Sequence, residues 1–171
     1  MTKIINLSIL SMLGLHVLPV TAGHLSVNQM NINLDKCYQQ TELVQQKSEA
    51  KELSIYACTK VLSNDWLSKE TESNTRLNRG IVYMAQGQYE KAKKDFKRSI
   101  SLNPNSYPAH VALAQLLYKD NDFVGALKHY DVAITLNSDA TAVVHNRQIV
   151  VDSILLEQKN RLAGVSKPDS E

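Results

Sequence analysis

A 34-residue period constrains this chain more than any other feature of its sequence. When residues 77–102 are shifted by that period, small residues fall on small, aromatic on aromatic and aliphatic on aliphatic. The first copy contains Gly80, Tyr83, Gly87, Tyr89, Ala92, Phe96, Ile100 and Leu102. The second copy contains Ala114, Leu117, Asn121, Phe123, Ala126, Tyr130, Ile134 and Leu136. A fixed period of this length is typical of stacked helical units, each burying its apolar face against its neighbours.

Each copy is predicted to hold two helices with a break between them. Helical spacing covers 75–86 and 89–102 in the first copy, and Gly87 lies between because glycine readily takes the left-handed conformation of a helix end. The second copy has the same spacing over 108–119 and 123–136. Asn121 takes the slot of Gly87, as expected for a residue that tolerates positive φ.

The period and the composition divide the chain into segments. The helical domain is predicted to span 35–158 and to consist of a degenerate repeat at 35–62, full repeats at 73–106 and 107–140, and a capping helix at 141–158. Residues 23–34 show little pattern and are predicted to be mobile, and the polar residues 159–171 are predicted to be a disordered tail. The expected fold class is all-α, with antiparallel helix pairs stacked into an α-solenoid and a C-terminal capping helix.

Residues 1–22 have the pattern of a cleavable export signal. Lys3 precedes a largely apolar run, and Val-Thr-Ala at 20–22 offers the small residues that a signal peptidase accepts. The alternative is a retained membrane anchor, although Ser8 and Ser11 dilute a run that needs about 20 apolar residues to span a bilayer. We therefore expect a periplasmic or secreted protein, or else one anchored through the uncleaved signal.

The two cysteines, Cys37 and Cys58, favour a disulfide in an oxidising compartment. If 35–47 and 48–62 are antiparallel helices, each cysteine lies about nine residues from the turn, or ~14 Å at ~1.5 Å per residue, so the two face each other. Such a closure contributes about 3 kcal/mol in the loop-entropy account. Two free buried thiols are the alternative. No C-x-x-C motif or nearby Cys/His cluster is present, so no metal site is predicted.

Composition and motifs predict neither catalysis nor nucleic-acid binding. The net charge is only +2, or +1 without Lys3, and no run of like charge indicates a nucleic-acid or membrane-surface partner. The histidines are scattered without a carboxylate or cysteine at ligand spacing, and no phosphate loop or nucleophile motif occurs. We expect no enzyme activity, no cofactor, no small-molecule substrate and no membrane contact beyond the signal.

The repeat resembles the tetratricopeptide repeat, a 34-residue helix–turn–helix family whose pattern is Trp, Leu-Gly and Tyr, then Ala, Phe, Ala and Pro. In the first copy these slots hold Arg76, Arg79, Gly80, Tyr83, Ala92, Phe96, Ser99 and Pro104. In the second they hold His110, Leu113, Ala114, Leu117, Ala126, Tyr130, Ala133 and Ser138. The tryptophan position thus holds a polar residue in both copies, Arg76 and His110, and the final proline is replaced by Ser138 in the second copy. The runs A-C-T at 57–59 and N-R-G at 78–80 are also similar to exported bacterial members.

The resemblance implies that a protein or peptide segment binds in a concave groove lined by the first helix of each repeat. Its lining would be Asn74, Leu77, Asn78, Ile81, Met84, Val111, Gln115, Tyr118, Lys119, His145, Asn146 and Ile149. Some members bind a C-terminal carboxylate; Asn78 matches their pattern, but Leu77 and Ile81 stand where polar or basic residues are expected. The groove therefore suits a helix or extended peptide with apolar anchors. For any one of these residues, packing against a neighbouring helix is the alternative.

The leading hypothesis is a non-enzymatic adaptor or scaffold in the cell envelope that captures a segment of another protein. A permanently packed subunit of an envelope or secretion assembly, and a small regulator of an envelope enzyme, are the alternatives.

Overall fold

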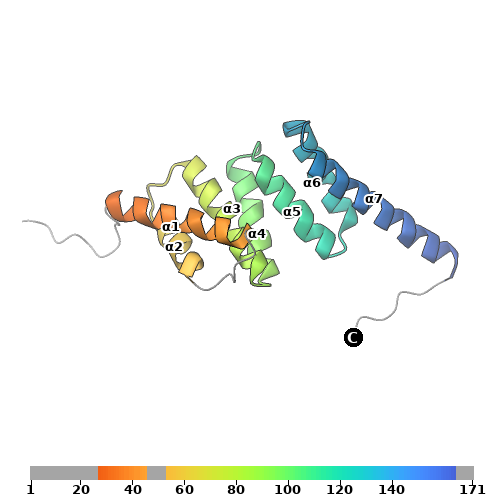
Figure 1. The fold of residues 1–171 in the computed structure, drawn as a ribbon, viewed down its shortest axis with the longest axis horizontal. Helices are drawn as coiled ribbons and strands as arrows, with labels where there is room; N and C mark the ends of the chain where they lie inside the picture. The colour runs from red at the N-terminus through yellow and green to blue at the C-terminus, as the bar shows by residue number, and fades with distance from the viewer. Residues whose placement is uncertain (1–26, 46–52, 165–171) are drawn as a thin grey trace, which may run out of the picture.

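The computed structural model describes residues 27–45 and 53–164, and these form seven helices with no strand (Figure 1). The helices are α1 (Val27–Gln45), α2 (Leu53–Leu62), α3 (Lys69–Ala85), α4 (Tyr89–Leu102), α5 (Tyr107–Lys119), α6 (Phe123–Leu136) and α7 (Thr141–Leu162). Consecutive helices pack against each other, and the pairs follow one another along the long axis of the molecule (Figure 1). The all-α repeat architecture is confirmed. The predicted signal at 1–22 and the end of the predicted tail lie outside the described residues.

The predicted breaks inside the two full repeats are present. The helices α4 and α6 begin and end at the predicted residues. Gly87 and Asn121 have φ angles of 73° and 60°, so the same left-handed turn closes the first helix of both repeats. Asp122 caps α6 by accepting a hydrogen bond from the Gly125 amide at 2.9 Å. None of the described helices combines the length and the hydropathy needed to cross a membrane.

The helix α1 corrects one prediction, because it begins at Val27 and so includes most of the segment 23–34 that was expected to be mobile. Tertiary contacts support the helical conformation there. Asn33 is buried, and the Asn64 amide donates to the Met30 sulfur at 3.1 Å. At the other end, α7 continues to Leu162, four residues past the predicted limit of 158.

The predicted disulfide joins Cys37 of α1 to Cys58 of α2, with an S–S distance of 2.00 Å. Both cysteines are fully buried and form a small core of their own with Ala57. The hairpin of α1 and α2 packs on α3 and so adds one degenerate unit to the N-terminal end of the array. Because this core is small, the covalent link is a large part of what holds the two helices together.

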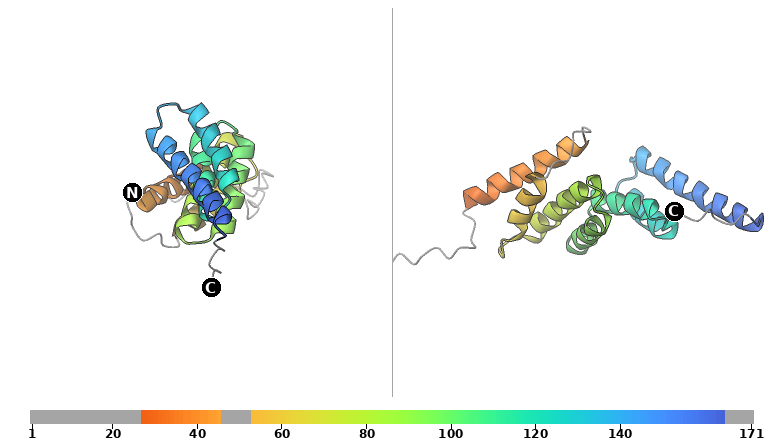
Figure 2. Two further views of the ribbon diagram at one scale, coloured as in Figure 1. Left: turned by 90° about the vertical axis from the view of Figure 1, so that its right-hand side faces the viewer. Right: turned by 90° about the horizontal axis from the view of Figure 1, so that it is seen from below.

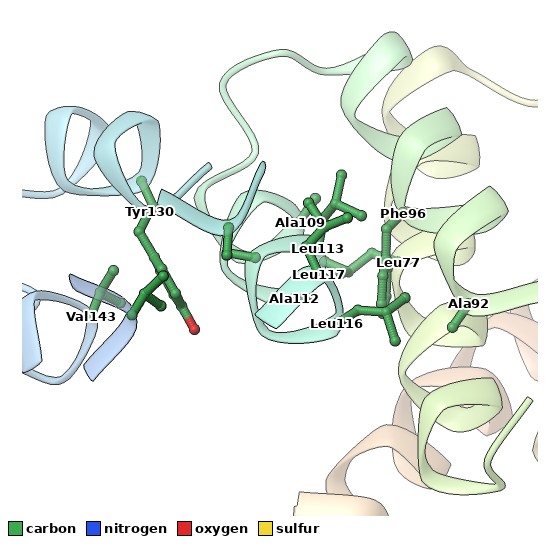
Figure 3. Close-up of a cluster of buried hydrophobic side chains, with 14 residues drawn as sticks. Leu77, Ala92, Phe96, Ala109, Ala112, Leu113, Leu116, Leu117, Tyr130 and Val143 are labelled. Atoms are coloured by element: carbon green, nitrogen blue, oxygen red, sulfur yellow. The ribbon is translucent and has the colours of Figure 1, made fainter. Parts of the chain in front are cut away.

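A single apolar core runs from α3 to α7 and includes Leu77, Phe96, Leu113, Tyr130 and Val143 (Figure 3). Its tightest contact lies between Gly80 of α3 and the ring of Phe96 in α4: a β-carbon at residue 80 would come within 2.5 Å of Cε1. The absence of a side chain at this position therefore lets the two helices approach. The second repeat has the same arrangement of types, with Ala114 and Tyr130 both buried.

An ion pair fills the seam between α3 and α4 where the family pattern has a leucine. The carboxylate of Asp95, only 3% exposed, accepts hydrogen bonds from Arg79 Nε at 2.7 Å and Arg79 Nη2 at 2.9 Å. Arg76 Nη1 donates to the same carboxylate at 3.3 Å. Two guanidinium groups thus compensate one buried carboxylate, which offsets the cost of taking these charges out of water.

We expect Asp95→Ala to lower the free energy of unfolding by about 3–5 kcal/mol, because it leaves Arg79 buried without its counter-charge. The double variant Arg79→Leu/Asp95→Leu is expected to recover most of this loss, since leucine is the family residue at position 79. Urea unfolding followed by circular dichroism measures both. If the single and double variants lost the same free energy of unfolding, the ion pair would not be what stabilises the packing of α3 against α4.

Candidate functional site

A pocket of about 180 Å³ lies where α5, α6 and α7 meet. Its walls are Gln115 and Tyr118 of α5, Tyr130 of α6, and Asn146 and Ile149 of α7. Sites for drug-sized ligands usually measure about 300–1,000 Å³. The pocket is therefore suited to one side chain of a larger partner rather than to a whole small molecule.

The helical period explains why these residues converge. Gln115 and Tyr118 are three residues apart on α5, and Asn146 and Ile149 are three apart on α7, so each pair lies on one face of its helix. Gln115 and Ile149 are also separated by one full period of 34 residues, and so occupy equivalent slots in successive units. Four of the predicted groove residues thus line one pocket.

The polar groups of the pocket walls are the hydroxyl groups of Tyr118 and Tyr130 and the side-chain amides of Gln115 and Asn146. The hydroxyl groups of Tyr118 and Ser153 lie 3.3 Å apart and join α5 to α7. The ring of Tyr118 is tilted against Phe123, with 5.7 Å between centroids. Burial, reinforced by Tyr118, raises the pKa of Tyr130 to about 12, so this phenol stays neutral at physiological pH. The walls therefore offer aromatic and aliphatic surface together with neutral amide and hydroxyl groups.

The part of the predicted groove on α3 is different, because its central residues are inside the molecule. Leu77 and Asn78 are each only 7% exposed, and Leu77 belongs to the core. Ile81, Met84 and Val111 are half-buried against that core. The inclusion of Leu77 and Asn78 in a ligand-contacting lining is thus corrected, because Leu77 packs in the core that runs from α3 to α7 and Asn78 is buried as well.

The remaining predicted residues do not line the pocket. Asn74 is half-buried on α3, and His145 is exposed at the start of α7. Lys119 is exposed and holds its ammonium 4.8 Å from the ring centroid of Tyr89, in a cation–π contact.

Two residues of the site were not predicted from the sequence. Tyr130 was assigned to the core because it holds the slot of Phe96, and it is indeed buried, but it also forms part of the pocket wall. The available signal was the change from phenylalanine to tyrosine, since a buried hydroxyl group generally needs a polar neighbour. Ser153 had no signal of its own, because its role depends on how α7 crosses α5.

Comparison with known families gives one match, and it falls on the predicted first full repeat. Residues 73–106 match the family described as Tetratricopeptide repeat. Residues 73–106 are thus a tetratricopeptide repeat. A comparison with curated proteins gives no match.

Solved tetratricopeptide domains have a similar fold. The Sgt2 domain from Aspergillus fumigatus superimposes with a TM-score of 0.62 at 20% identity, over 82% of this chain and 87% of that one. The first such domain of Spaghetti (RPAP3), bound to the HSP90 peptide SRMEEVD, gives 0.64 at 14% identity, over 77% and 98%. The TPR2B domain of yeast Sti1, in complex with pHsp70, gives 0.58 at 14% identity, over 71% and 98%. At these identities the likeness establishes the fold.

A histidine pair occupies the seam of the second repeat, where His110 stands in the family's tryptophan slot. His110 Nε2 lies 3.0 Å from the carbonyl oxygen of Pro104 and must donate to it, which leaves Nδ1 as an acceptor. His129 Nδ1, 3.0 Å from His110 Nδ1, is then the donor. Within the described residues no three histidine, cysteine or acidic side chains are placed to hold a metal ion.

We expect the histidine pair to make stability depend on pH. Burial, followed by His110 and the nearby Lys128 and Lys97, lowers the pKa of His129, against a weaker opposing effect of Asp122. The unfolded chain therefore binds a proton at this site before the folded chain does, and stability falls as pH drops through ~6.5. The slope is limited to about 1.4 kcal/mol per pH unit, and stays well below that because the ring is only half-buried.

His129→Asn retains a donor near the position of Nδ1 but cannot titrate. Its melting temperature should thus depend less on pH between about 7.5 and 5.5 than that of the native chain, as measured by differential scanning fluorimetry. The matched control is His145→Asn, at an exposed histidine, which should leave the dependence unchanged. An unaltered slope in His129→Asn would contradict the assignment.

Proposed function

We propose that this protein is a non-enzymatic adaptor that captures a segment of another protein, with one apolar side chain of that segment in the pocket between α5, α6 and α7. The observation that carries the proposal is the convergence of four side chains, placed by the repeat period on two helices, around a space of side-chain size. Solved domains of the same fold hold peptide segments, such as SRMEEVD on Spaghetti. Tyr118 is the main anchor, because it combines a large ring with a hydroxyl group that can donate.

The chemistry of the pocket favours a ligand different from the acidic peptides of those relatives. The Spaghetti peptide and the peptide SGPTIEEVD on human RPAP3 both end in E-E-V-D. Here no lysine or arginine lines the pocket, and the ammonium of Lys119 contacts Tyr89. An acidic tail would therefore lose water without gaining a counter-charge. A peptide segment that places a leucine- or methionine-sized side chain in the pocket, with its backbone amide groups available to the wall amides and hydroxyl groups, fits this chemistry better than an acidic tail.

An envelope location is part of the proposal. The signal-like pattern at 1–22 supports it, and so does the buried disulfide, because such bonds persist mainly in oxidising compartments. The permanently packed subunit and the regulator of an envelope enzyme are the competing functions. A stable large complex on native sizing that survives the loss of Tyr118 would favour the packed subunit. A change in the rate of an envelope enzyme on adding the purified protein would favour the regulator.

Peptides selected from a random displayed library against the full chain provide the probe. We expect Tyr118→Ala to weaken their binding at least about 10-fold, which corresponds to about 1.4 kcal/mol, because it removes both the aromatic wall and the hydroxyl group. Isothermal titration calorimetry measures the affinity. Selected sequences should be enriched in apolar residues and poor in acidic ones.

The matched control is Tyr56→Ala, which removes an aromatic side chain of the same size from α2; Tyr56 is 64% exposed and lies outside this pocket. It should leave affinity unchanged. Equal affinities for the native chain and Tyr118→Ala would rule out the pocket as the binding site. The peptide SRMEEVD serves as a second probe and should not bind measurably.

A further inference from the structure

The last helix extends well beyond the helix on which it packs. α7 has 22 residues and α6 has 14. Of the helices described, only α6 makes substantial contact with α7. Figures 1 and 2 show the C-terminal part of α7 projecting from the end of the molecule opposite α1 and α2.

One face of α7 is apolar and uncovered. Val144, Val151, Leu155 and Leu162 follow one another at intervals of seven, four and seven residues, so they form a stripe along one side of the helix. Val144 is 47% exposed, Leu155 58% and Leu162 90%. Val143 and Val150, by contrast, are buried on the other side of the helix.

The repeat period identifies this stripe as the face that a second helix covers in the earlier units. Val144 and Val151 stand one period after His110 and Leu117, and two periods after Arg76 and Tyr83. A second helix in the usual geometry does not fit here. Gln148 occupies the slot of Gly80 and Ala114, and at Gly80 even a β-carbon would come within 2.5 Å of the facing ring.

We propose that the occupant of this face is α7 of a second copy of this chain, packed antiparallel to the first. A two-fold interface must be self-complementary. Asp152 and Lys159 lie seven residues apart beside the stripe, so a two-fold axis near residues 155–156 places Asp152 of each copy beside Lys159 of the other. Neither side chain has a salt bridge within its own described chain; Asp152 accepts only from the Gln148 amide, at 2.9 Å.

The projection of α7 makes this arrangement sterically simple. Figure 2 shows the C-terminal part of α7 projecting beyond the other helices, so in the proposed pairing these ends overlap and the two arrays extend in opposite directions. The helix is about 33 Å long at ~1.5 Å per residue, and an axis near residues 155–156 pairs residues 149–162, roughly two-thirds of the helix. The contact is thus smaller than a standard interface of about 1,600 Å², and the dimer should be reversible and dependent on concentration.

Sedimentation equilibrium of the full chain over a wide concentration range tests the proposal. We expect a monomer–dimer equilibrium that Leu155→Ser/Leu162→Ser abolishes and that Tyr56→Ser, on the far side of the molecule, leaves intact. Circular dichroism checks that each variant keeps its helices. A monomer at every concentration overturns the proposal, as does a dimer that the α7 variant leaves unchanged.

Charge exchange tests the antiparallel pairing itself. Asp152→Lys and Lys159→Asp should each weaken dimerisation about 10-fold, because each creates two like-charge pairs, and the double variant should restore it. If Lys159→Asp has no effect, or the double variant is no better than the single ones, the antiparallel register is wrong.

Discussion

The approach of a small residue, glycine or alanine, to an aromatic ring sets the geometry of the array. Gly80 lets α3 lie directly on the ring of Phe96, and a single added carbon would come within 2.5 Å of that ring. In the next unit Ala114 and Tyr130 hold the same slots and are likewise buried. Because small and aromatic residues recur at a fixed period, the chain repeats one helix-pair geometry, and this repetition decides where every exposed side chain lies.

The pocket follows from that repetition. Since α5 and α7 are first helices of successive units, residues one period apart, such as Gln115 and Ile149, lie side by side on the same surface. The cross-helix contact between Tyr118 and Ser153 forms at the same place. Within the described residues, α7 is a first helix with no second helix packed on it. The pocket lies beside α7, and the apolar stripe lies on another face of the same helix.

Local patterns in the sequence were enough to predict the parts of the fold that depend on local chemistry. Gly87 and Asn121 marked the turns, and the spacing of Cys37 and Cys58 gave the disulfide. The start of α1 at Val27 was not predictable in this way, because it depends on contacts with α2 and α3. The burial of Asn78 and the part of Tyr130 in the pocket likewise depend on packing between units. The position of a residue within one repeat does not reveal how neighbouring units pack.

A double-mutant cycle between Gly80 and Phe96 tests the geometric claim most directly. The ring is fully buried and a β-carbon at residue 80 would come within 2.5 Å of it, so Gly80→Ala should lower the free energy of unfolding by about 1–3 kcal/mol. Phe96→Leu removes the clash, so the double variant should be more stable than the sum of the two single losses predicts. Losses that simply add, or a neutral Gly80→Ala, would show that this contact does not set the spacing of the helices.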